Sequence, residues 1–201
     1  MASATSLCPI KAMARLYLIR HGRPASIWGG ADDDPGLDET GHAQALATAE
    51  RLLALPAARR PGGVASSPLR RCRETAQPLA DALGVNVHIV PAVGEIPTPA
   101  GLESAARPTW LRQALSGRWD EISGDLDYDL WRREVTGAVA ARPGWAMFSH
   151  FVAINAVLSL IGGDDRVIGF RPDHASVTTL EIGKGGLVVI ERGREAATGV
   201  L

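Results

Sequence analysis

The sequence is poor in cysteine. Cys8 and Cys72 are the only two among 201 residues, and they do not form a C-x-x-C pair or another metal-ligand spacing. Two cysteines placed in this way do not indicate a disulfide framework. Their scarcity is typical of a reducing compartment, so we predict a cytoplasmic protein.

Long apolar runs and an excess of charge are also lacking. No apolar run reaches the roughly 20 residues that a membrane-spanning helix needs. Residues 1–14 have no long apolar core of the kind that a signal peptide contains, and we predict that they form a flexible N-terminal extension. The formal net charge is −1, which does not favour a nucleic-acid or membrane surface. We therefore expect neither nucleic acid nor membrane as a partner.

The chain does contain enough apolar residues for a core, with 46% hydrophobic and 21% charged residues. Residues 15–201 are predicted to form a single domain. Patterning predicts strands at 15–19, 63–67, 85–90, 144–149, 176–182 and 187–192. It predicts helices at 41–55, 68–84, 109–116, 125–140 and 151–163. This alternation favours a three-layer α/β/α fold with a mostly parallel central sheet and an antiparallel strand from the final hairpin.

Several local signals refine these elements. Thr40 is predicted to cap the first helix, Pro78 to kink or break the second, and Gly162 to close the last. Residues 91–123 are irregular and rich in proline and glycine around one short helix. We interpret them as a lid-like insertion.

Reactive side chains follow three of the predicted strands. Arg20 and His21 follow the first strand, Ser67 ends the second and leads toward Arg71, and His150 follows the strand at 144–149. In such sheets, ligands bind outside the carboxyl ends of the strands. Arginines beside a helix N-terminus make an anion site, and phosphate is the anion that they suit best. The histidines are candidates for the nucleophile and the acid or base of phosphoryl transfer.

Five segments stand out along the chain: "LIRHG" (18–22), "PGLDETGHAQA" (35–45), "ASSPLRRCRETA" (65–76), "SH" (149–150) and "HASVTTL" (174–180). At these five places the sequence resembles the histidine phosphatase superfamily, branch 1, whose members are phosphoglycerate mutase-like. Their order matches that of the family. The resemblance runs from about residue 15 to residue 182, and it implies the phosphoglycerate mutase-like fold.

The resemblance implies a role for each matching residue. His21 would be the nucleophile that forms a phosphohistidine, and Arg20 would bind the phosphate. Arg71 is the arginine that aligns in the third segment, and His150 would contact the same phosphate. Glu95 lies in the segment that supplies the acidic residue of the family, which protonates the leaving group and then activates water.

Three further residues are candidates for substrate binding. Ser67 either donates a hydrogen bond to substrate or caps the following helix. Arg23 is either a lid contact or a surface residue. His174 stands where the family has an asparagine and either approaches the site or bonds to backbone. Trp28 is the tryptophan to test for substrate contact.

No metal and no cofactor are expected, because arginines neutralise the phosphate in this chemistry. The acidic run "ADDDPG" (31–36) is interpreted as a solvated turn.

The sequence departs from the family pattern beside the second histidine. Phe151 stands where a glycine is usual, and Asn155 lies near the position of the usual arginine. We expect the Phe151 ring to narrow the site or shift the substrate. The longer mid-chain region of the phosphoglycerate mutases has no clear match in 91–123.

These features favour a metal-independent phosphatase acting on a small phosphorylated substrate or a phosphoprotein. Mutase-type phosphoryl transfer and a non-catalytic phosphate-ligand binding protein are the alternatives. A homodimer is an open option for the oligomeric state.

Overall fold

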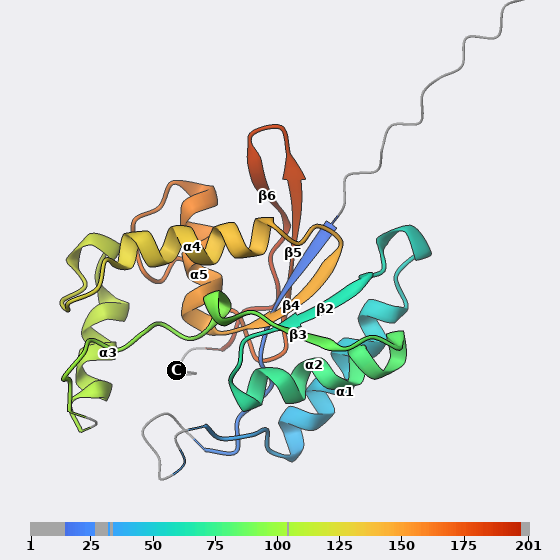
Figure 1. Ribbon diagram of the computed structural model, residues 1–201, viewed down its shortest axis with the longest axis horizontal. Helices are drawn as coiled ribbons and strands as arrows, with labels where there is room; N and C mark the ends of the chain where they lie inside the picture. The colour runs from blue at the N-terminus through green and yellow to red at the C-terminus, as the bar shows by residue number, and fades with distance from the viewer. Residues whose placement is uncertain (1–14, 27–31, 33, 104, 198–201) are drawn as a thin grey trace, which may run out of the picture.

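The computed structural model describes residues 15–26, 32, 34–103 and 105–197 (Figure 1). The predictions for the extension at 1–14 and for Trp28 concern residues outside these ranges.

The described strands form one sheet in the order β3-β2-β4-β1-β5-β6. Their bounds are β1 Arg15–Arg20, β2 Gly63–Ser66, β3 Val87–Ile89, β4 Trp145–Ser149, β5 Val177–Gly183 and β6 Gly186–Glu191. The first four pair in parallel, whereas β5 runs antiparallel to β1 and β6 antiparallel to β5. Strands β2 and β4 are almost wholly buried, as expected for strands covered on both faces. The mostly parallel sheet with a final antiparallel strand is confirmed.

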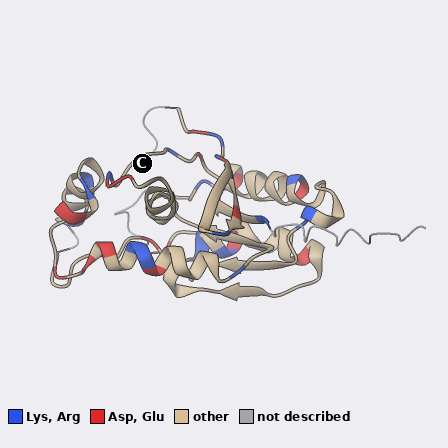
Figure 2. Cartoon of the chain, turned by 90° about the horizontal axis from the view of Figure 1, so that it is seen from above, with Lys and Arg blue, Asp and Glu red and all other residues tan. Residues whose placement is uncertain are grey.

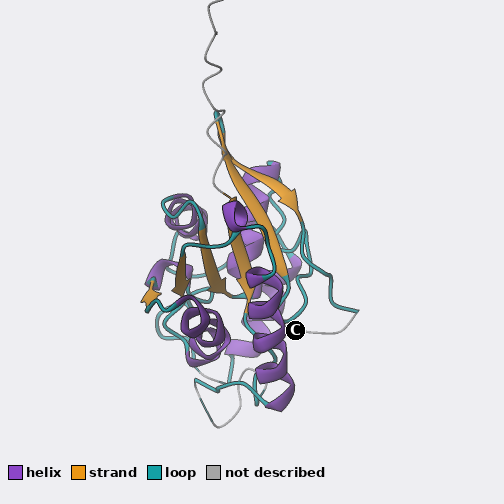
Figure 3. Ribbon diagram, turned by 90° about the vertical axis from the view of Figure 1, so that its right-hand side faces the viewer, coloured by secondary structure: helices purple, strands orange, loops and turns teal. Residues whose placement is uncertain are grey.

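Helices cover both faces of this sheet (Figures 1 and 3). The helices are α1 Glu39–Leu53, α2 Arg70–Leu83, α3 Arg107–Ser116, α4 Tyr128–Ala140 and α5 Phe151–Gly162, with short 3₁₀ turns η1 Ala57–Arg59, η2 Pro91–Val93 and η3 Trp119–Glu121. Helices α1 and α2 bury Leu52 and Leu79 against Tyr17 on one face. Helices α4 and α5 bury Val135 and Ile154 with residues of the other face. The three-layer α/β/α architecture is therefore confirmed. Charged residues lie mainly on the helices and loops, with both signs interspersed (Figure 2).

The start of α1 differs from the prediction. Asp38 is the N-cap, and its Oδ1 accepts a hydrogen bond from the Gly41 N–H at 2.7 Å. The Thr40 hydroxyl instead accepts from Arg23 Nη2 at 2.8 Å. An aspartate two residues earlier satisfies a free N–H of the first turn, so Thr40 is not needed there.

Two other helix predictions are also corrected. Helix α2 begins at Arg70 rather than Pro68 and continues through Pro78 to Leu83, so the proline does not break it, and Gly84 follows as the C-cap in the left-handed conformation. The buried face that includes Leu79 holds the helix together across the proline. Helix α5 is closed by Gly163, at φ 63°, and Gly162 is its last helical residue.

Residues 91–123 contain η2, α3 and η3. An apolar cluster anchors this segment and includes Ile96, Trp110, Trp119, Tyr128 and Phe151. The Trp119 N–H donates to the Asp165 carbonyl at 2.9 Å. The segment is thus packed against α4 and the N-terminal end of α5. No helix in the described ranges is long and apolar enough to cross a membrane.

Candidate active site

The carboxyl ends of β1, β2 and β4 meet at one edge of the sheet. Arg20 lies opposite Ser149 across β1 and β4. The His21 N–H then donates to the Ser149 carbonyl at 3.0 Å, and the Ser67 N–H donates to the Phe148 carbonyl at 2.9 Å. These ladder bonds bring together residues 21, 67 and 150, each of which directly follows its strand.

His21 is buried and is oriented by its own backbone. Its Nδ1 lies 2.8 Å from the Gly22 carbonyl oxygen. Because a carbonyl only accepts, Nδ1 carries the proton and Nε2 keeps a free lone pair. The imidazole centroid lies 5.3 Å from that of His150 and 5.7 Å from that of His174.

Burial lowers the pKa of His21 well below its usual value, and the nearby charges of His150, Arg71 and Arg20 lower it further. The imidazole is therefore neutral at neutral pH. A neutral ring with a free Nε2 has the form that a nitrogen nucleophile requires.

The loop after His21 rests on α1 and α2. The Gly22 N–H donates to Thr75 Oγ1 at 2.9 Å, and the Arg23 N–H donates to Gln44 Oε1 at 2.9 Å. A Cβ on Gly41 would lie 2.2 Å from the Arg23 carbonyl oxygen. Gly41, Gln44 and Thr75 were missed as functional candidates, although all lie within the segments that carry the resemblance.

Arg71 is the arginine of α2 that faces the site. It is 4% exposed, and its Nη2 lies 3.3 Å from His150 Nδ1 and 3.9 Å from Glu95 Oε2. The neighbouring Arg70 is turned away and pairs with Glu74 at 2.7 Å on the surface. The helical rotation between adjacent residues separates the two guanidinium groups.

The Arg20 side chain is buried at the same sheet edge. Its Nη1 donates to the Pro172 carbonyl at 2.9 Å, and its guanidinium carbon lies over the Phe151 ring, 5.1 Å from the centroid. Its Nε is buried and has no hydrogen-bond partner among the described residues. Burial lowers the pKa of Arg20 to about 10, so the group remains cationic at neutral pH.

Glu95 brings a carboxyl group from the segment 91–123 to this cluster. Its Oε2 lies 3.5 Å from His150 Nδ1. Burial raises the pKa of Glu95, and the charges of Arg71 and Arg20 partly oppose this. The carboxyl group therefore keeps its proton to a higher pH than an exposed glutamate, as a general acid requires.

Ser67 contacts His150 and is completely buried. Its Oγ lies 2.8 Å from His150 Nε2 and accepts from the Leu69 N–H at 3.3 Å. Arginine can only donate, so its approach to Nδ1 places the His150 proton on Nε2, where it is donated to Ser67. Burial lowers the pKa of His150, with the Arg71 charge as the next cause.

The other two substrate-binding candidates take different places. Arg23 forms an ion pair with Asp38, and its side chain is 53% exposed. His174 is buried beside His21, and burial lowers its pKa to about 4. The structure therefore brings His174, but not the Arg23 guanidinium, into the histidine cluster.

Asn155 has a structural place on α5. Its Oδ1 accepts from the Gly169 and Phe170 N–H groups at 3.1 and 3.0 Å, and its Nδ2 donates to the Phe151 carbonyl at 3.0 Å. It does not stand in for a phosphate-binding arginine.

The described residues include no group of three or more His, Cys, Asp or Glu side chains that could hold a metal ion. In the acidic run, Asp34 Oδ1 accepts from the Arg70 N–H at 2.8 Å at the start of α2.

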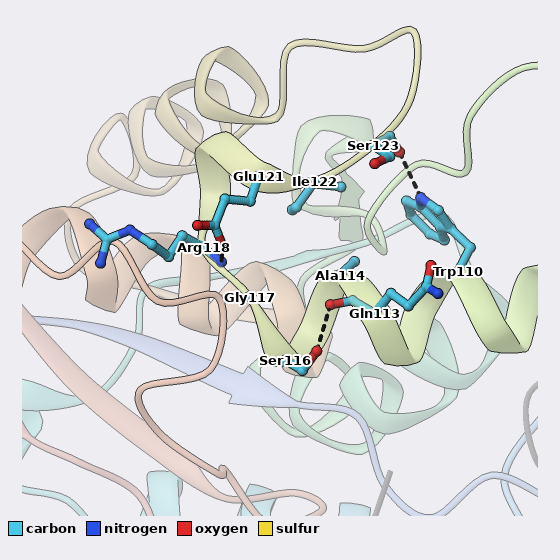
Figure 4. A pocket seen from close by; sticks show the side chains of 9 residues that line it. All are labelled: Trp110, Gln113, Ala114, Ser116, Gly117, Arg118, Glu121, Ile122 and Ser123. Carbon is cyan, nitrogen blue, oxygen red and sulfur yellow. Dashed lines mark hydrogen bonds between the residues drawn. The ribbon is translucent and has the colours of Figure 1, made fainter.

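A pocket of about 260 Å³ lies between the end of α3 and η3 (Figure 4). Its wall includes Trp110, whose Nε1 donates to the Ser123 carbonyl at 2.8 Å, and Arg118, whose N–H donates to Glu121 Oε2 at 3.1 Å. None of the residues that line it is a predicted site residue.

Residues 16–194 match the family model of the histidine phosphatase superfamily (branch 1). The chain belongs to this superfamily. Family membership, together with the similarity to solved phosphatases, supports a phosphatase or phosphoryl-transfer activity.

Solved structures share the phosphoglycerate mutase-like fold. Phosphoserine phosphatase from Entamoeba histolytica, in complex with 3-phosphoglyceric acid, is 22% identical at a TM-score of 0.70, covering 90% of this chain and 98% of that one. A mycobacterial glucosyl-3-phosphoglycerate phosphatase with inorganic phosphate is also 22% identical, with a TM-score of 0.67 and the same coverage.

One curated relative is much longer than this chain. The transcription factor tau 55 kDa subunit of Saccharomyces cerevisiae is 30% identical over 142 residues. The match spans 59% of this chain and 32% of that protein.

Proposed function

We propose that the protein is a phosphatase that hydrolyses a phosphomonoester through a phosphohistidine on His21. The observation that carries this proposal is the bond from His21 Nδ1 to the Gly22 carbonyl. It leaves Nε2 free within a buried cluster that contains two arginines. Cationic groups around a free imidazole nitrogen suit attack on a phosphate dianion.

In the first step, the His21 Nε2 lone pair forms a bond to phosphorus while the bond from phosphorus to the leaving oxygen breaks. Protonated Glu95 gives its proton to that oxygen. Arg20 and Arg71 spread the charge on the phosphoryl oxygens, which is greatest in the transition state, and His150 contributes once its Nε2–H turns from Ser67 to a phosphoryl oxygen.

In the second step, water attacks the phosphohistidine. The Glu95 carboxylate takes a proton from the water. The water oxygen forms the new bond to phosphorus while the bond between phosphorus and His21 Nε2 breaks. Inorganic phosphate leaves, and both residues return to their starting protonation states.

The proposed substrate is a small phosphomonoester or a phosphorylated protein side chain. We propose that no metal takes part, because the two buried guanidinium groups supply the charge that a metal would otherwise supply. Activity is then expected to survive EDTA. Loss of activity with EDTA and its recovery with a divalent cation would contradict this part of the proposal.

Two other functions remain testable alternatives. A mutase-type enzyme would pass the phosphoryl group from His21 to an organic acceptor rather than to water. A non-catalytic protein would bind phosphate or vanadate while hydrolysis stayed at background, an alternative that the unusual Phe151 favours.

The test is hydrolysis of an aryl phosphate from about pH 4 to about pH 8, comparing the wild type with His21→Ala. We expect turnover in the wild type, an acid-labile phosphoenzyme after rapid quenching, and neither in the variant. Matching thermal unfolding of the two proteins controls for folding. Full activity in His21→Ala would refute the assignment.

A further inference from the structure

The position of the Phe151 ring relative to the candidate site was not predicted from the sequence. The ring does not stand free beside the phosphate-binding groups, since it is 4% exposed and lies against Arg20. The guanidinium carbon is 5.1 Å from the ring centroid, within the range of a cation–π contact. One face of the Arg20 guanidinium is therefore covered by the ring.

Two backbone contacts act on the same arginine. The Arg20 N–H donates to the Ser176 carbonyl at 3.3 Å, and Nη1 donates to the Pro172 carbonyl at 2.9 Å. A planar guanidinium with one nitrogen bonded and one face covered has little rotational freedom. Its Nε remains buried with no hydrogen-bond partner in the described part of the chain, so this donor is unused by the protein.

The ring also belongs to the apolar cluster of the segment 91–123. Phe151 packs in that cluster with Ile96 and Trp110, and Ile96 directly follows Glu95. The ring therefore lies between the arginine at the end of β1 and the segment that carries the carboxyl group. Its first neighbour in sequence, His150, is itself in the site.

We infer that Phe151 is a positioning residue that fixes the Arg20 guanidinium for binding of the phosphoryl group. This inference rests on the proposed function and deepens it. The ring acts as a platform for the arginine rather than as an obstruction in the site. Because the contact is desolvated, loss of the aromatic face should weaken anion binding more than loss of an equal apolar volume elsewhere.

The direct test is binding of inorganic phosphate by calorimetry, with KM and kcat for an aryl phosphate. Phe151→Leu keeps an apolar side chain but removes the ring. We expect phosphate affinity to fall by about tenfold and KM to rise similarly, with a smaller change in kcat. Phe151→Tyr keeps the aromatic face and should restore most of the affinity.

Val152→Ala is the matched control. Val152 is the next residue of α5, is equally buried and packs in the same apolar cluster. Its truncation should lower the thermal stability without changing phosphate affinity. An equal loss of affinity in Val152→Ala would show that general packing is responsible and would overturn the inference.

Phe151→Gly introduces the residue that is usual in the family. This variant distinguishes a platform from an obstruction, because the two interpretations predict opposite changes in phosphate affinity. A platform predicts weaker phosphate binding, whereas an obstruction predicts tighter binding and faster turnover. If Phe151→Leu does not fold, Phe151→Met replaces it. Unchanged phosphate affinity in a folded variant that lacks the ring overturns the inference while the wild-type activity stands. Absence of phosphate binding in the wild type overturns the proposed function as well.

Discussion

The sheet edge and the segment 91–123 both contribute to the candidate site, but they are held in different ways. At the sheet edge, buried polar groups are held by short hydrogen bonds, such as those from His21 to the Gly22 carbonyl and from His150 to Ser67. The segment 91–123 is held by an aromatic and apolar cluster and by exposed ion pairs such as Arg118 with Asp165.

This difference separates two tasks. Directional hydrogen bonds fix the orientation of rings and guanidinium groups, which phosphoryl transfer requires. Apolar packing is less directional and suffices to hold a segment that brings one carboxyl group, Glu95, to the site. Substitutions of the polar groups at the sheet edge should therefore lower activity, whereas those in the segment away from Glu95 should leave activity unchanged.

The largest contrast is expected between two arginines. Arg71→Ala removes a buried cation beside His150 and Glu95, and we expect kcat/KM to fall by roughly a thousandfold. Arg118→Ala removes an exposed ion pair and should cost at most about 1 kcal/mol of stability with no loss of activity. Comparable activity losses in both variants would contradict the division of tasks.

Substitutions at two glycines compare the loop after His21 with the segment 91–123 in their effect on the free energy of unfolding. In Gly41→Ala the new Cβ would lie 2.2 Å from the Arg23 carbonyl oxygen, so the loop after His21 must move, at a cost of about 3 kcal/mol. In Gly117→Ala the nearest atom is the flexible end of Glu121, at 3.2 Å, and we expect less than about 1 kcal/mol. Denaturant unfolding of both variants measures the difference, and equal midpoints would refute it.

Glu95 allows the chemical task of the segment to be isolated. Glu95→Gln cannot protonate a leaving group, so we expect kcat/KM for an alkyl phosphate to fall by about a hundredfold. An aryl phosphate, whose leaving group needs less protonation, should still phosphorylate His21. The phosphoenzyme should then accumulate, with a burst of released aryl alcohol. The reason is that no carboxylate remains to take a proton from the attacking water.

The pH dependence follows from the same two residues. His21 must be unprotonated, and its pKa is lowered, so the acidic limb of kcat/KM should lie below the usual histidine range. Glu95 must be protonated, and its pKa is raised, so activity should fall as the pH rises through a value above the usual glutamate range. The expected profile is a bell with an acidic optimum, and Glu95→Gln should lose the descending limb.

The smallest effect is expected at two serines. Ser67→Ala frees the His150 ring that Ser67 holds, and we expect kcat to fall by about tenfold in a folded protein. Ser116→Ala removes a bond to the Gln113 carbonyl on the exposed end of α3 and should leave kcat unchanged. Equal rates for both variants would show that Ser67 does not orient the ring.

The order of elements and the reactive strand ends could be predicted from the sequence because both are local. Buried parallel strands appear as short apolar runs, and the residues that follow them are next in the chain. This placed residues 20, 21 and 150 at one edge. The segments resembling the family then separated these histidines from ordinary buried ones.

The resemblance pointed to Arg71, but Arg70, Arg71 and Arg73 lie on one helix turn and the sequence alone does not show which of them enters the site. The rotation of α2 against the sheet decides this, and it buries Arg71 alone of the three. The helix caps depended in the same way on partners elsewhere in the chain. Asp38 caps α1, while Thr40 is bound by Arg23.

The sequence by itself determined the fold class, the superfamily and the chemical groups available at the sheet edge, because these depend on local patterns and motifs. Only the tertiary structure decided what each group contacts. Phe151 is the clearest example, since its departure from the family pattern is visible in the sequence but its position against Arg20 is not. A side chain in a packed interior acts through neighbours that are distant in the chain, and these are set by packing.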